Sequence, residues 1–247
     1  MLKYFLTELK HQLLNPAAIF FVVIMPISMF LIFGGQAELS EKLPSGVNIS
    51  GLIAIQMGFY GAILASSQAG ADIGQMRESG WLRTLHLNGM NDSRYTLIRL
   101  ALSYAVVVPQ LVLLYTVAAF TFADMPLKIW AYSAFMTILL GGLYAGVGQI
   151  FGAFLPANAA NGLASGFVVL GSFLSDMFMP LTGTMYKVGQ FMPFFGTKTL
   201  VAWQATQGKG TLGNELNLTY LTLNVVIWLG IITFLSWWTL RFTRTRS

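Results

Sequence analysis

Three kinds of residue are scarce or missing in this sequence, and each absence excludes a class of protein. The 247 residues include no cysteine, which excludes disulfide scaffolds, thiolate metal sites and cysteine nucleophiles. The two histidines, His11 and His86, are too few for a histidine-rich metal cluster. Only 9% of the residues are charged and 55% are hydrophobic, whereas soluble domains carry about 25% charged residues. This composition indicates a membrane protein, and it is far too apolar for a disordered chain.

Long stretches without a charged residue locate the membrane spans. A spanning helix needs about 20 mostly apolar residues. Four of the uncharged stretches hold one span each, and residues 129–175 hold two spans, separated by a predicted turn from Pro156 to Gly162. The six predicted spans lie near residues 17–35, 51–71, 101–122, 132–154, 161–178 and 219–240. Because six is an even number, both termini are expected on the same side of the membrane.

The distribution of basic residues orients these spans. All seven arginines fall on one side, either between spans two and three or at the C-terminus. Lys3 and Lys10 join them there, which gives nine basic residues against five on the other side. The positive-inside rule therefore predicts that both termini are cytoplasmic.

Residues 1–15 are predicted to form an amphipathic helix at the inner membrane interface. Leucines from Leu2 to Leu13 recur at helical spacing, and polar residues occupy the other positions until Pro16 ends the pattern. The alternative is a cytoplasmic extension of span one. We expect residues 1–37 to be retained, because the apolar run is longer than the usual core of a signal peptide.

Residues 72–99 form the one substantial cytoplasmic segment between spans. It is charged, yet it keeps apolar side chains such as Ile73, Met76 and Trp81 at near-helical spacing. Apolar groups among charges on a cytoplasmic surface indicate docking to a soluble partner. The alternative is an interfacial helix that buries these side chains among lipid headgroups.

The predicted external segment 177–217 is unusually apolar for a loop. It contains two clusters of aromatic and methionine residues, one ending at Pro180 and the other around Pro193. We expect a helical hairpin that dips into the outer leaflet, where its irregular backbone must be buried in protein.

Glycines recur with small-xxx-small spacing in spans four and five, which permits close contact between helices. We expect these glycines to serve packing inside the protein. The pairs are Gly142 with Gly146, Gly148 with Gly152, and Gly162 with Gly166.

Chemical groups needed by other membrane machines are missing. No ionisable residue lies in the middle of a predicted span, which argues against an ion-driven carrier and against a membrane enzyme. There is no G-x-x-x-x-G-K-[ST] phosphate loop, so any ATPase would be a separate chain. Uncharged polar residues do occur in the spans, and they predict either helix–helix hydrogen bonds or a weakly polar path for an amphiphilic substrate. They are Gln56, Tyr60, Ser66, Ser67, Gln68, Gln149, Ser165 and Ser172.

The order of these features resembles the permease subunit of type-2 ABC transporters of the exporter family, over essentially the whole chain. Met76–Leu85 is similar to the family's R-E-x-G-T-L-x-x-L stretch after span two. Phe173–Pro180 is similar to its L-S-G-x-x-x-P at the end of span five, and Phe191–Phe194 to its x-x-P before the last span. The family often has Gly where this chain has Asp176, and Thr where it has Trp81.

The resemblance implies an all-α membrane protein that forms a single permease domain over residues 1–247. It has six transmembrane helices, the N-terminal interfacial helix, a cytoplasmic coupling helix within 72–99, and an outer re-entrant helical hairpin within 177–217. The implied location is the cytoplasmic (inner) membrane of a prokaryote, within the lipid bilayer and away from nucleic acid. The implied function is export of an amphiphilic drug, lipid or antimicrobial peptide.

The implied partners supply the energy. Two permeases, either identical or paired with a sister chain, would assemble with two ATP-binding cassette subunits. Those subunits would bind ATP and Mg²⁺ and hydrolyse the ATP, so this chain itself needs no cofactor and is not an enzyme. The alternatives are a polysaccharide-exporting ABC permease, which the aromatic hairpin disfavours, and an ion-coupled secondary transporter, which should show inverted repeats and charges at mid-depth.

The resemblance also assigns roles to individual residues. Spans two and five would line the substrate path, with Gln56, Tyr60, Ser67, Phe167, Ser172 and Phe173. The hairpin would form the outer gate, with Met179, Pro180, Phe191, Pro193 and Phe194. Charged and apolar side chains of the coupling helix would dock to the ATPase, and these are Met76, Arg77, Glu78, Trp81, Leu82 and Arg83.

Overall fold

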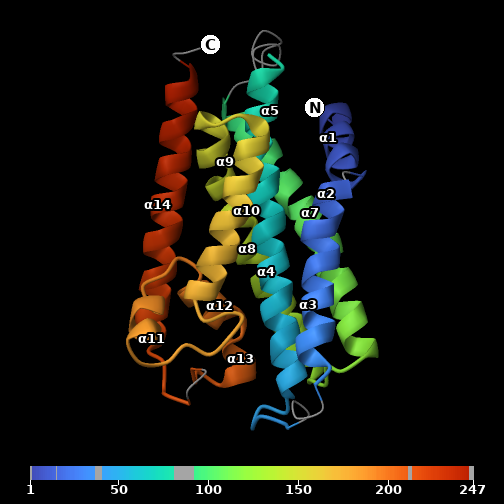
Figure 1. Cartoon of the computed structure of the whole chain (residues 1–247), viewed down its shortest axis with the longest axis vertical. Helices are drawn as coiled ribbons and strands as arrows, with labels where there is room; N and C mark the ends of the chain where they lie inside the picture. Colours follow the sequence, from blue (N-terminus) through green and yellow to red (C-terminus); the bar gives the residue numbers. More distant parts are fainter. Residues whose placement is uncertain (1, 15, 37–40, 81–91, 211–212, 245–247) are drawn as a thin grey trace.

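The computed structural model is an elongated bundle of helices whose long members run side by side (Figure 1). It describes residues 2–14, 16–36, 41–80, 92–210 and 213–244. Within these ranges the regular structure is helical, apart from two isolated bridges, Lys42 with Asn48 and Lys209 with Glu215. The prediction of an all-α protein is therefore confirmed for this part of the chain.

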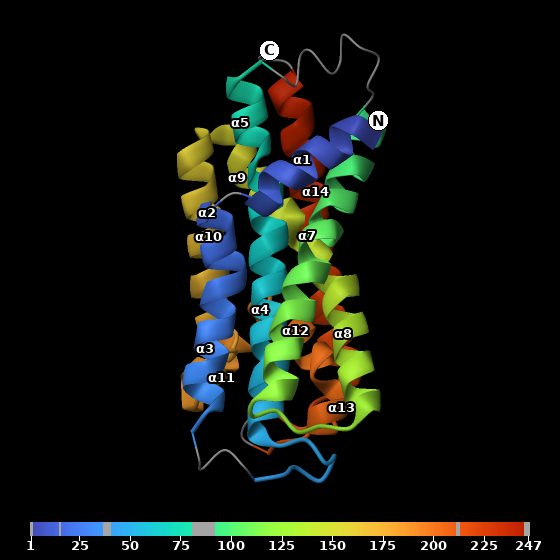
Figure 2. The ribbon, with the colours of Figure 1, turned by 90° about the vertical axis from the view of Figure 1, so that its right-hand side faces the viewer.

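The first half of the chain forms an oblique helix and three long helical segments. Figure 2 shows α1 lying at an angle to the long axis of the bundle. The elements are α1 (Leu2–Leu14), α2 (Pro16–Ile19), the π-helical turn η1 (Phe20–Ile24), α3 (Met25–Gly34), α4 (Ile49–Ala71), α5 (Ile73–Glu78) and α7 (Asp92–Phe120).

The second half adds three more long segments and a group of short helices. The elements are α8 (Leu127–Gly141), the 3₁₀ turn η3 (Gly142–Tyr144), α9 (Ala145–Phe154), α10 (Ala157–Leu174), α11 (Gly183–Gly189), α12 (Phe195–Val201), α13 (Trp203–Thr206) and α14 (Leu218–Arg244).

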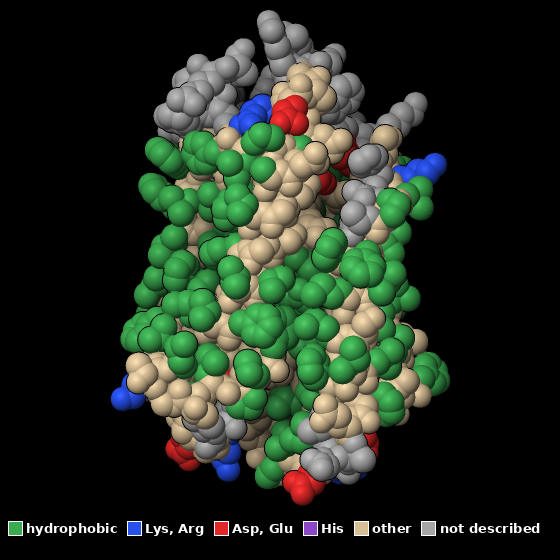
Figure 3. Space-filling model, viewed as in Figure 1, with side chains coloured by type: hydrophobic (Ala, Val, Ile, Leu, Met, Phe, Trp, Pro, Cys, Tyr) green, Lys and Arg blue, Asp and Glu red, His purple; other side chains and the backbone are tan. Residues whose placement is uncertain are grey.

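Five helical segments are long and apolar enough to cross a membrane, and they match predicted spans two to six. They are Ile49–Glu78, Leu97–Phe120, Leu127–Phe154, Ala157–Leu174 and Leu218–Thr239. The segment at predicted span one is helical and apolar, but Phe20–Gly34 falls short of a spanning length. The surface view agrees with a membrane-embedded protein, because hydrophobic side chains cover its middle and charged ones gather near its two ends (Figure 3).

The two ends of the bundle differ in what they carry. The start of α1, the end of α14 and α5 lie at one end, and α11, α12 and α13 lie towards the other (Figure 1). We name these the inner end and the outer end, after the predicted orientation.

The predicted boundaries of span five are wrong by about one helical turn. The segment after Pro156, predicted as a turn, is the first part of α10, and the helix ends at Leu174 instead of at 178. Pro156 supplies an extended N-cap at φ −57°, ψ 149°, and the alanines that follow favour helix. Asp176, at φ +61°, ends the helix at the other side.

Helix α4 occupies the centre of the bundle (Figure 2). In its most apolar stretch 78% of the residues are buried within the chain, against 22% in α14. Glycines bring α9 against it: a Cβ on Gly148 would lie 1.7 Å from the Ser67 carbonyl oxygen, and one on Gly70 would lie 1.9 Å from that of Ala145. The predicted packing role of glycine is confirmed at this contact.

The same prediction is wrong for the glycine pair in span five. A Cβ on Gly162 or Gly166 would meet no atom within 4 Å. These two residues therefore make no close contact with another helix of the described chain. Small residues at this spacing permit such a contact but do not require one.

We expect Gly148→Ala to destabilise the protein, because even a methyl group must push α9 away from α4. The cost of such overpacking is about 1–3 kcal/mol, measured as a lower midpoint of thermal unfolding in detergent. Gly230→Ala is the matched control, since nothing lies within 4 Å of a Cβ there. Equal midpoints for the two variants would contradict the assigned contact.

Candidate functional site

A groove runs along one side of α4, between the N-terminal helices and α10. It encloses about 720 Å³. Phe21, Val22 and Met25 form one wall, and α10 contributes the opposite wall from Asn158 to Leu170. Residues of α4 from Tyr60 to Ala69 form the floor.

The groove changes from polar to apolar along its length. Its inner end is lined by Gln12, Asp72, Asn158 and Asn161. Farther along the same helices the lining residues are mainly apolar and aromatic, among them Tyr60, Leu64, Val169 and Leu170. A molecule with a polar head and an apolar body matches this order.

Hydrogen bonds hold the polar end of the groove together. Gln12 Nε2 donates to Asp72 Oδ2 at 2.9 Å, which joins α1 to the end of α4. Gln68 Nε2 donates to Ser165 Oγ at 3.3 Å across the floor. In addition, an Arg99 guanidinium nitrogen lies 3.9 Å from a Glu8 carboxylate oxygen, which links α7 to α1.

The structure places one predicted path residue, Tyr60, in the groove. Ser67 and Ser172 are fully buried instead, and Gln56 lines a second cavity at the outer end. Phe178 packs between Phe173 and Tyr60. The centre of the Phe178 ring lies 4.7 Å from that of the Phe173 ring and 4.9 Å from that of the Tyr60 ring. These three rings form an aromatic cluster beyond the apolar end of the groove.

The sixth predicted path residue, Phe167, lies on α10 with 37% of its surface exposed. Its ring packs against Phe151 at 6.1 Å and against Phe194 at 6.0 Å. It therefore joins α10 to α9 and to the outer hairpin and is not part of the groove lining.

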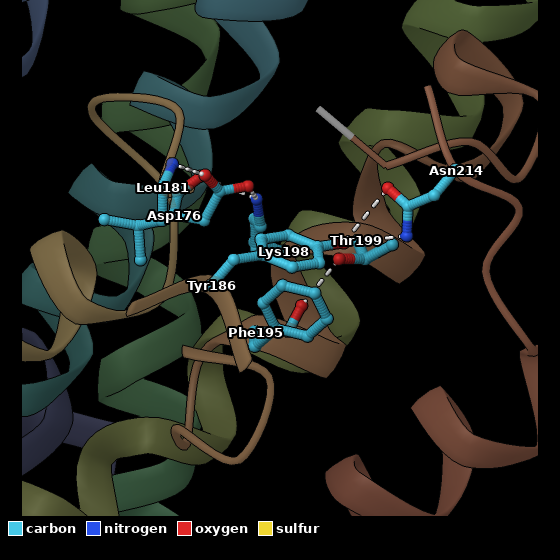
Figure 4. A network of polar contacts seen from close by, with 7 residues as sticks. All are labelled: Asp176, Leu181, Tyr186, Phe195, Lys198, Thr199 and Asn214. Atoms are coloured by element: carbon cyan, nitrogen blue, oxygen red, sulfur yellow. Dashed lines mark hydrogen bonds and ion pairs between the residues drawn. The ribbon is translucent and has the colours of Figure 1, made fainter. Parts of the chain in front are cut away.

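The second cavity encloses about 490 Å³ and lies between the outer half of α4 and the hairpin. It is mostly apolar, with Leu52, Met177 and Phe195 among its lining residues. Asp176 and Lys198 also line it and form a buried ion pair (Figure 4).

The geometry of this ion pair is closely held. Lys198 Nζ lies 2.8 Å from Asp176 Oδ2 and also donates to the Asp176 backbone carbonyl at 2.6 Å. The Leu181 backbone N–H donates to Asp176 Oδ1 at 2.6 Å (Figure 4). Only 2% of Asp176 and 6% of Lys198 is exposed. Burial lowers the pKa of Lys198, and the charge of Asp176 and its hydrogen bond act in the opposite direction.

Asp176 combines this contact with a left-handed backbone conformation, at φ +61°. Glycine adopts this conformation without steric cost, and aspartate is one of the few other residues that tolerate it. The sequence pattern does not predict this pair, because 22 residues separate its members.

The predicted outer-gate residues divide into two groups. Met179, Pro180 and Phe191 are exposed, whereas Pro193 and Phe194 are buried. The Phe194 ring lies 5.1 Å from the Tyr144 ring, and the Tyr144 hydroxyl donates to the Pro193 carbonyl at 2.9 Å. The buried group therefore fastens the hairpin to the bundle.

Side chains of α14 satisfy the hairpin backbone in the same way. Asn224 Nδ2 donates to the Gln190 carbonyl at 3.1 Å, and Trp228 Nε1 donates to the Phe191 carbonyl at 2.8 Å. The irregular backbone of this segment is thus partly satisfied by other parts of the protein, which a location in the membrane requires.

Three of the predicted docking residues contact the chain itself. Met76 is buried. Arg77 donates to the carbonyls of Ala153 and Leu155 at the end of α9, the latter at 3.1 Å. Glu78 Oε1 accepts from the Ala157 N–H at 3.3 Å, at the start of α10. Helix α5 is therefore attached to the α9–α10 turn. Trp81, Leu82 and Arg83 lie outside the described residues.

Comparison with known proteins adds no assignment. No protein-family model matches the chain, and no curated protein matches it. In the described part of the chain, no group of three or more His, Asp or Glu residues could hold a metal ion. Three structural features remain as a basis for assigning a function. They are the groove along α4, the ion pair at the outer end and the attachment of α5 to the α9–α10 turn.

We expect Lys198→Met to destabilise the protein strongly, because it leaves the Asp176 carboxylate buried without its counter-charge. Breaking one side of a buried pair costs about 3–5 kcal/mol, measured as a loss of thermal stability in detergent. Adding Asp176→Asn should recover most of this loss, since asparagine also tolerates the left-handed conformation.

Lys42→Met is the control, because Lys42 and Asp124 form an ion pair in which both side chains are more than half exposed. Such a surface pair contributes at most about 1 kcal/mol. If the Lys198 single variant were as stable as the Lys42 variant, the importance of the buried pair would be contradicted.

Proposed function

We propose that this chain is the membrane-spanning permease subunit of an ATP-driven exporter of the type-2 ABC family, and that it moves an amphiphilic substrate out across the cytoplasmic membrane. The observation that carries the proposal is the groove along α4, which is polar at its inner end and apolar beyond it. Its walls include α10 and its floor is α4, the two spans that the sequence resemblance assigns to the substrate path.

The position of charges supports an energy source outside this chain. The five candidate spans contain Asp72, Arg77, Glu78, Arg99 and Lys128, each near an end of its helix. Proton- and ion-coupled carriers use ionisable groups at mid-depth. An amphiphile that enters the groove from the inner side would therefore be moved by a conformational change that another subunit drives.

The attachment of α5 offers a way to transmit that change. An ATPase that docks on the inner end around Arg77 and Glu78 would act on a helix bonded to the α9–α10 turn. Movement of α5 would then move α10, which forms one wall of the groove.

The outer end offers the matching barrier. The cluster of Tyr60, Phe173 and Phe178 lies between the groove and the outer cavity. The hairpin behind it is held by Asp176 and Lys198. Release of substrate would require the three rings of the aromatic cluster to separate. This agrees with the outer-gate role expected for the hairpin.

A second permease, either a copy of this chain or a sister chain, would complete the path. Only 28% of the residues in the apolar stretch of α10 are buried within the chain. Two such helices facing each other would enclose a groove from both sides, and ATP-binding subunits would sit on the inner end of each.

The direct test is to purify the tagged full chain from its native host in mild detergent and to assay the eluate for ATP hydrolysis. We expect a soluble ATPase subunit to co-purify in a fixed ratio with the chain. A lone chain without ATPase activity, under conditions that preserve other membrane complexes, would contradict the proposal and favour an ion-coupled secondary transporter.

A double substitution in the docking segment, Glu78→Arg with Trp81→Ala, should uncouple transport from ATP hydrolysis while the permease still inserts. The charge reversal removes a carboxylate from the inner end, and the second change removes an apolar contact with the partner. The measurement is stimulation of ATPase activity in the reconstituted complex.

Glu215→Arg provides the control for charge reversal, because Glu215 is exposed in the outer segment before α14. Normal stimulation in the double variant would show that docking does not use this segment.

A further inference from the structure

The second cavity, which we call the outer cavity, combines an apolar lining with a small set of polar groups. The lining includes Leu52 and Ile53 of α4, Met177 and Phe178 after α10, and Phe195 of α12. The volume of about 490 Å³ lies in the range of pockets that hold small organic ligands. A ligand with an apolar body therefore suits the cavity both in size and in lining.

Positive charge prevails in this lining. Among the described residues, the charged side chains that line the outer cavity are Asp176, Lys198 and Lys209. Asp176 and Lys198 form the buried ion pair, in which one charge offsets the other (Figure 4). Lys209 adds a second cation, and its side chain forms no ion pair with a described residue. The lining thus presents two cations against one carboxylate.

The ion pair itself has a donor to spare. Asp176 already accepts from the Leu181 N–H at Oδ1 and from Lys198 Nζ at Oδ2. An ammonium group has three N–H donors, and Lys198 gives two of them to Asp176, at Oδ2 and at the backbone carbonyl. The third forms no hydrogen bond with the described residues. The pair can therefore donate to a ligand.

A further donor comes from α4. Gln56 lines the outer cavity, and its side chain forms no hydrogen bond with the described residues. Its amide group carries two N–H donors beside its acceptor oxygen. A polar group in an apolar lining costs free energy unless water or a ligand bonds it. A ligand with an acceptor group would satisfy this amide.

The mouth of the cavity lies at the outer end of the bundle. Gln207, Lys209 and Gly213 line the cavity and are exposed, and they follow α13, which lies at that end (Figure 1). The backbones of Lys209 and Glu215 form a bridge, but no ion pair joins these two residues, and Glu215 is not part of the lining. A ligand that arrives from the outer solution would therefore meet a lysine at the mouth.

From this arrangement we infer that the outer cavity binds a small organic anion from the outer solution, with a carboxylate head and an apolar body. The lysine and amide donors of the lining would bind the head, and the apolar residues of α4 and α12 would contact the body. An amine head would add a cation to a lining that already has two, and such like-charge placement rejects a ligand. The inference goes beyond the proposed function, because it concerns binding by this chain and no transport step.

The test uses the full chain alone in nanodiscs of phosphatidylcholine, whose headgroups have no net charge. The probes are 4-phenylbutyrate, 4-phenylbutanol and 4-phenylbutylamine, which share one apolar body and differ in the charge of the head at neutral pH. Binding is measured by equilibrium dialysis, and empty nanodiscs give the part that is due to lipid.

We expect saturable binding of the carboxylate, about tenfold tighter than that of the alcohol, which is the ratio that a charge-assisted hydrogen bond produces. The amine should bind most weakly. Equal binding of the carboxylate and the amine would overturn the inference, and so would a carboxylate that shows no saturable binding.

Lys209→Gln removes the cation at the mouth and changes an exposed position only. It should weaken binding of the carboxylate about threefold, as expected for an exposed charge, and leave the alcohol unchanged. Lys187→Gln is the matched control, because Lys187 is an exposed lysine of α11 that does not line the cavity. Equal affinities of the two variants for the carboxylate would contradict binding of the head at this mouth.

The location can be tested with single cysteines, because the chain has none. Thr206 lines the outer cavity, whereas Thr219 is exposed at the start of α14 and does not. Saturating 4-phenylbutyrate should slow the reaction of Thr206→Cys with a water-soluble maleimide several-fold and leave Thr219→Cys unchanged. Equal slowing at both positions, or at neither, would overturn the site.

An anionic lipid headgroup could offer the same chemistry from within the membrane. The dialysis is therefore repeated with part of the phosphatidylcholine replaced by phosphatidylglycerol, at a salt concentration that screens the charge of the lipid surface. Unchanged binding of the carboxylate would support a ligand from the outer solution. Loss of binding would show that lipid occupies the cavity and would overturn that source.

Discussion

The close contact between α4 and α9 is the constraint on which the rest of the bundle depends. Glycines at 70 and 148 let the two backbones approach until no Cβ would fit between them. Without water between helices, association in a membrane relies on such packing and on polar contacts. The contact occupies one side of α4, and the groove lies along another side, between the N-terminal helices and α10.

Polar contacts complete the bundle at both ends, where the helices give way to irregular backbone. At the outer end, Asp176 and Lys198 hold the segment after α10 against α12, and α14 donates to carbonyls of the hairpin. At the inner end, Arg77 and Glu78 bind the α9–α10 turn. Helix α10 is therefore joined to a polar network at each end, and the proposed transport cycle would move α10 relative to both networks.

Hydropathy and charge were sufficient to predict the helical class and the five helices that are long and apolar enough to cross a membrane, because exclusion of water imposes long apolar helices. They could not place the start of α10, where Pro156 followed by small residues fits either a turn or a helix start. They also could not show which face of a helix meets which neighbour. For that reason the sequence pattern did not distinguish Tyr60, which lines the groove, from Ser67, which is buried, and it did not single out Asp72, which lines the inner end of the groove. The pairing of Asp176 with Lys198 depends on tertiary structure, which local pattern does not contain.

The central claim is that ATP changes access to the groove on α4, and the absence of cysteine from the chain makes a direct measurement possible. Ser165→Cys would place a single thiol in the groove, and Leu223→Cys would place one on the exposed face of α14. The measurement is the rate of reaction with a water-soluble maleimide in vesicles that hold the chain with its co-purified ATPase. The account predicts that trapping the complex with ATP and vanadate changes the rate at position 165 and leaves the rate at 223 unchanged. Identical rates at 165 with and without the nucleotide would contradict it.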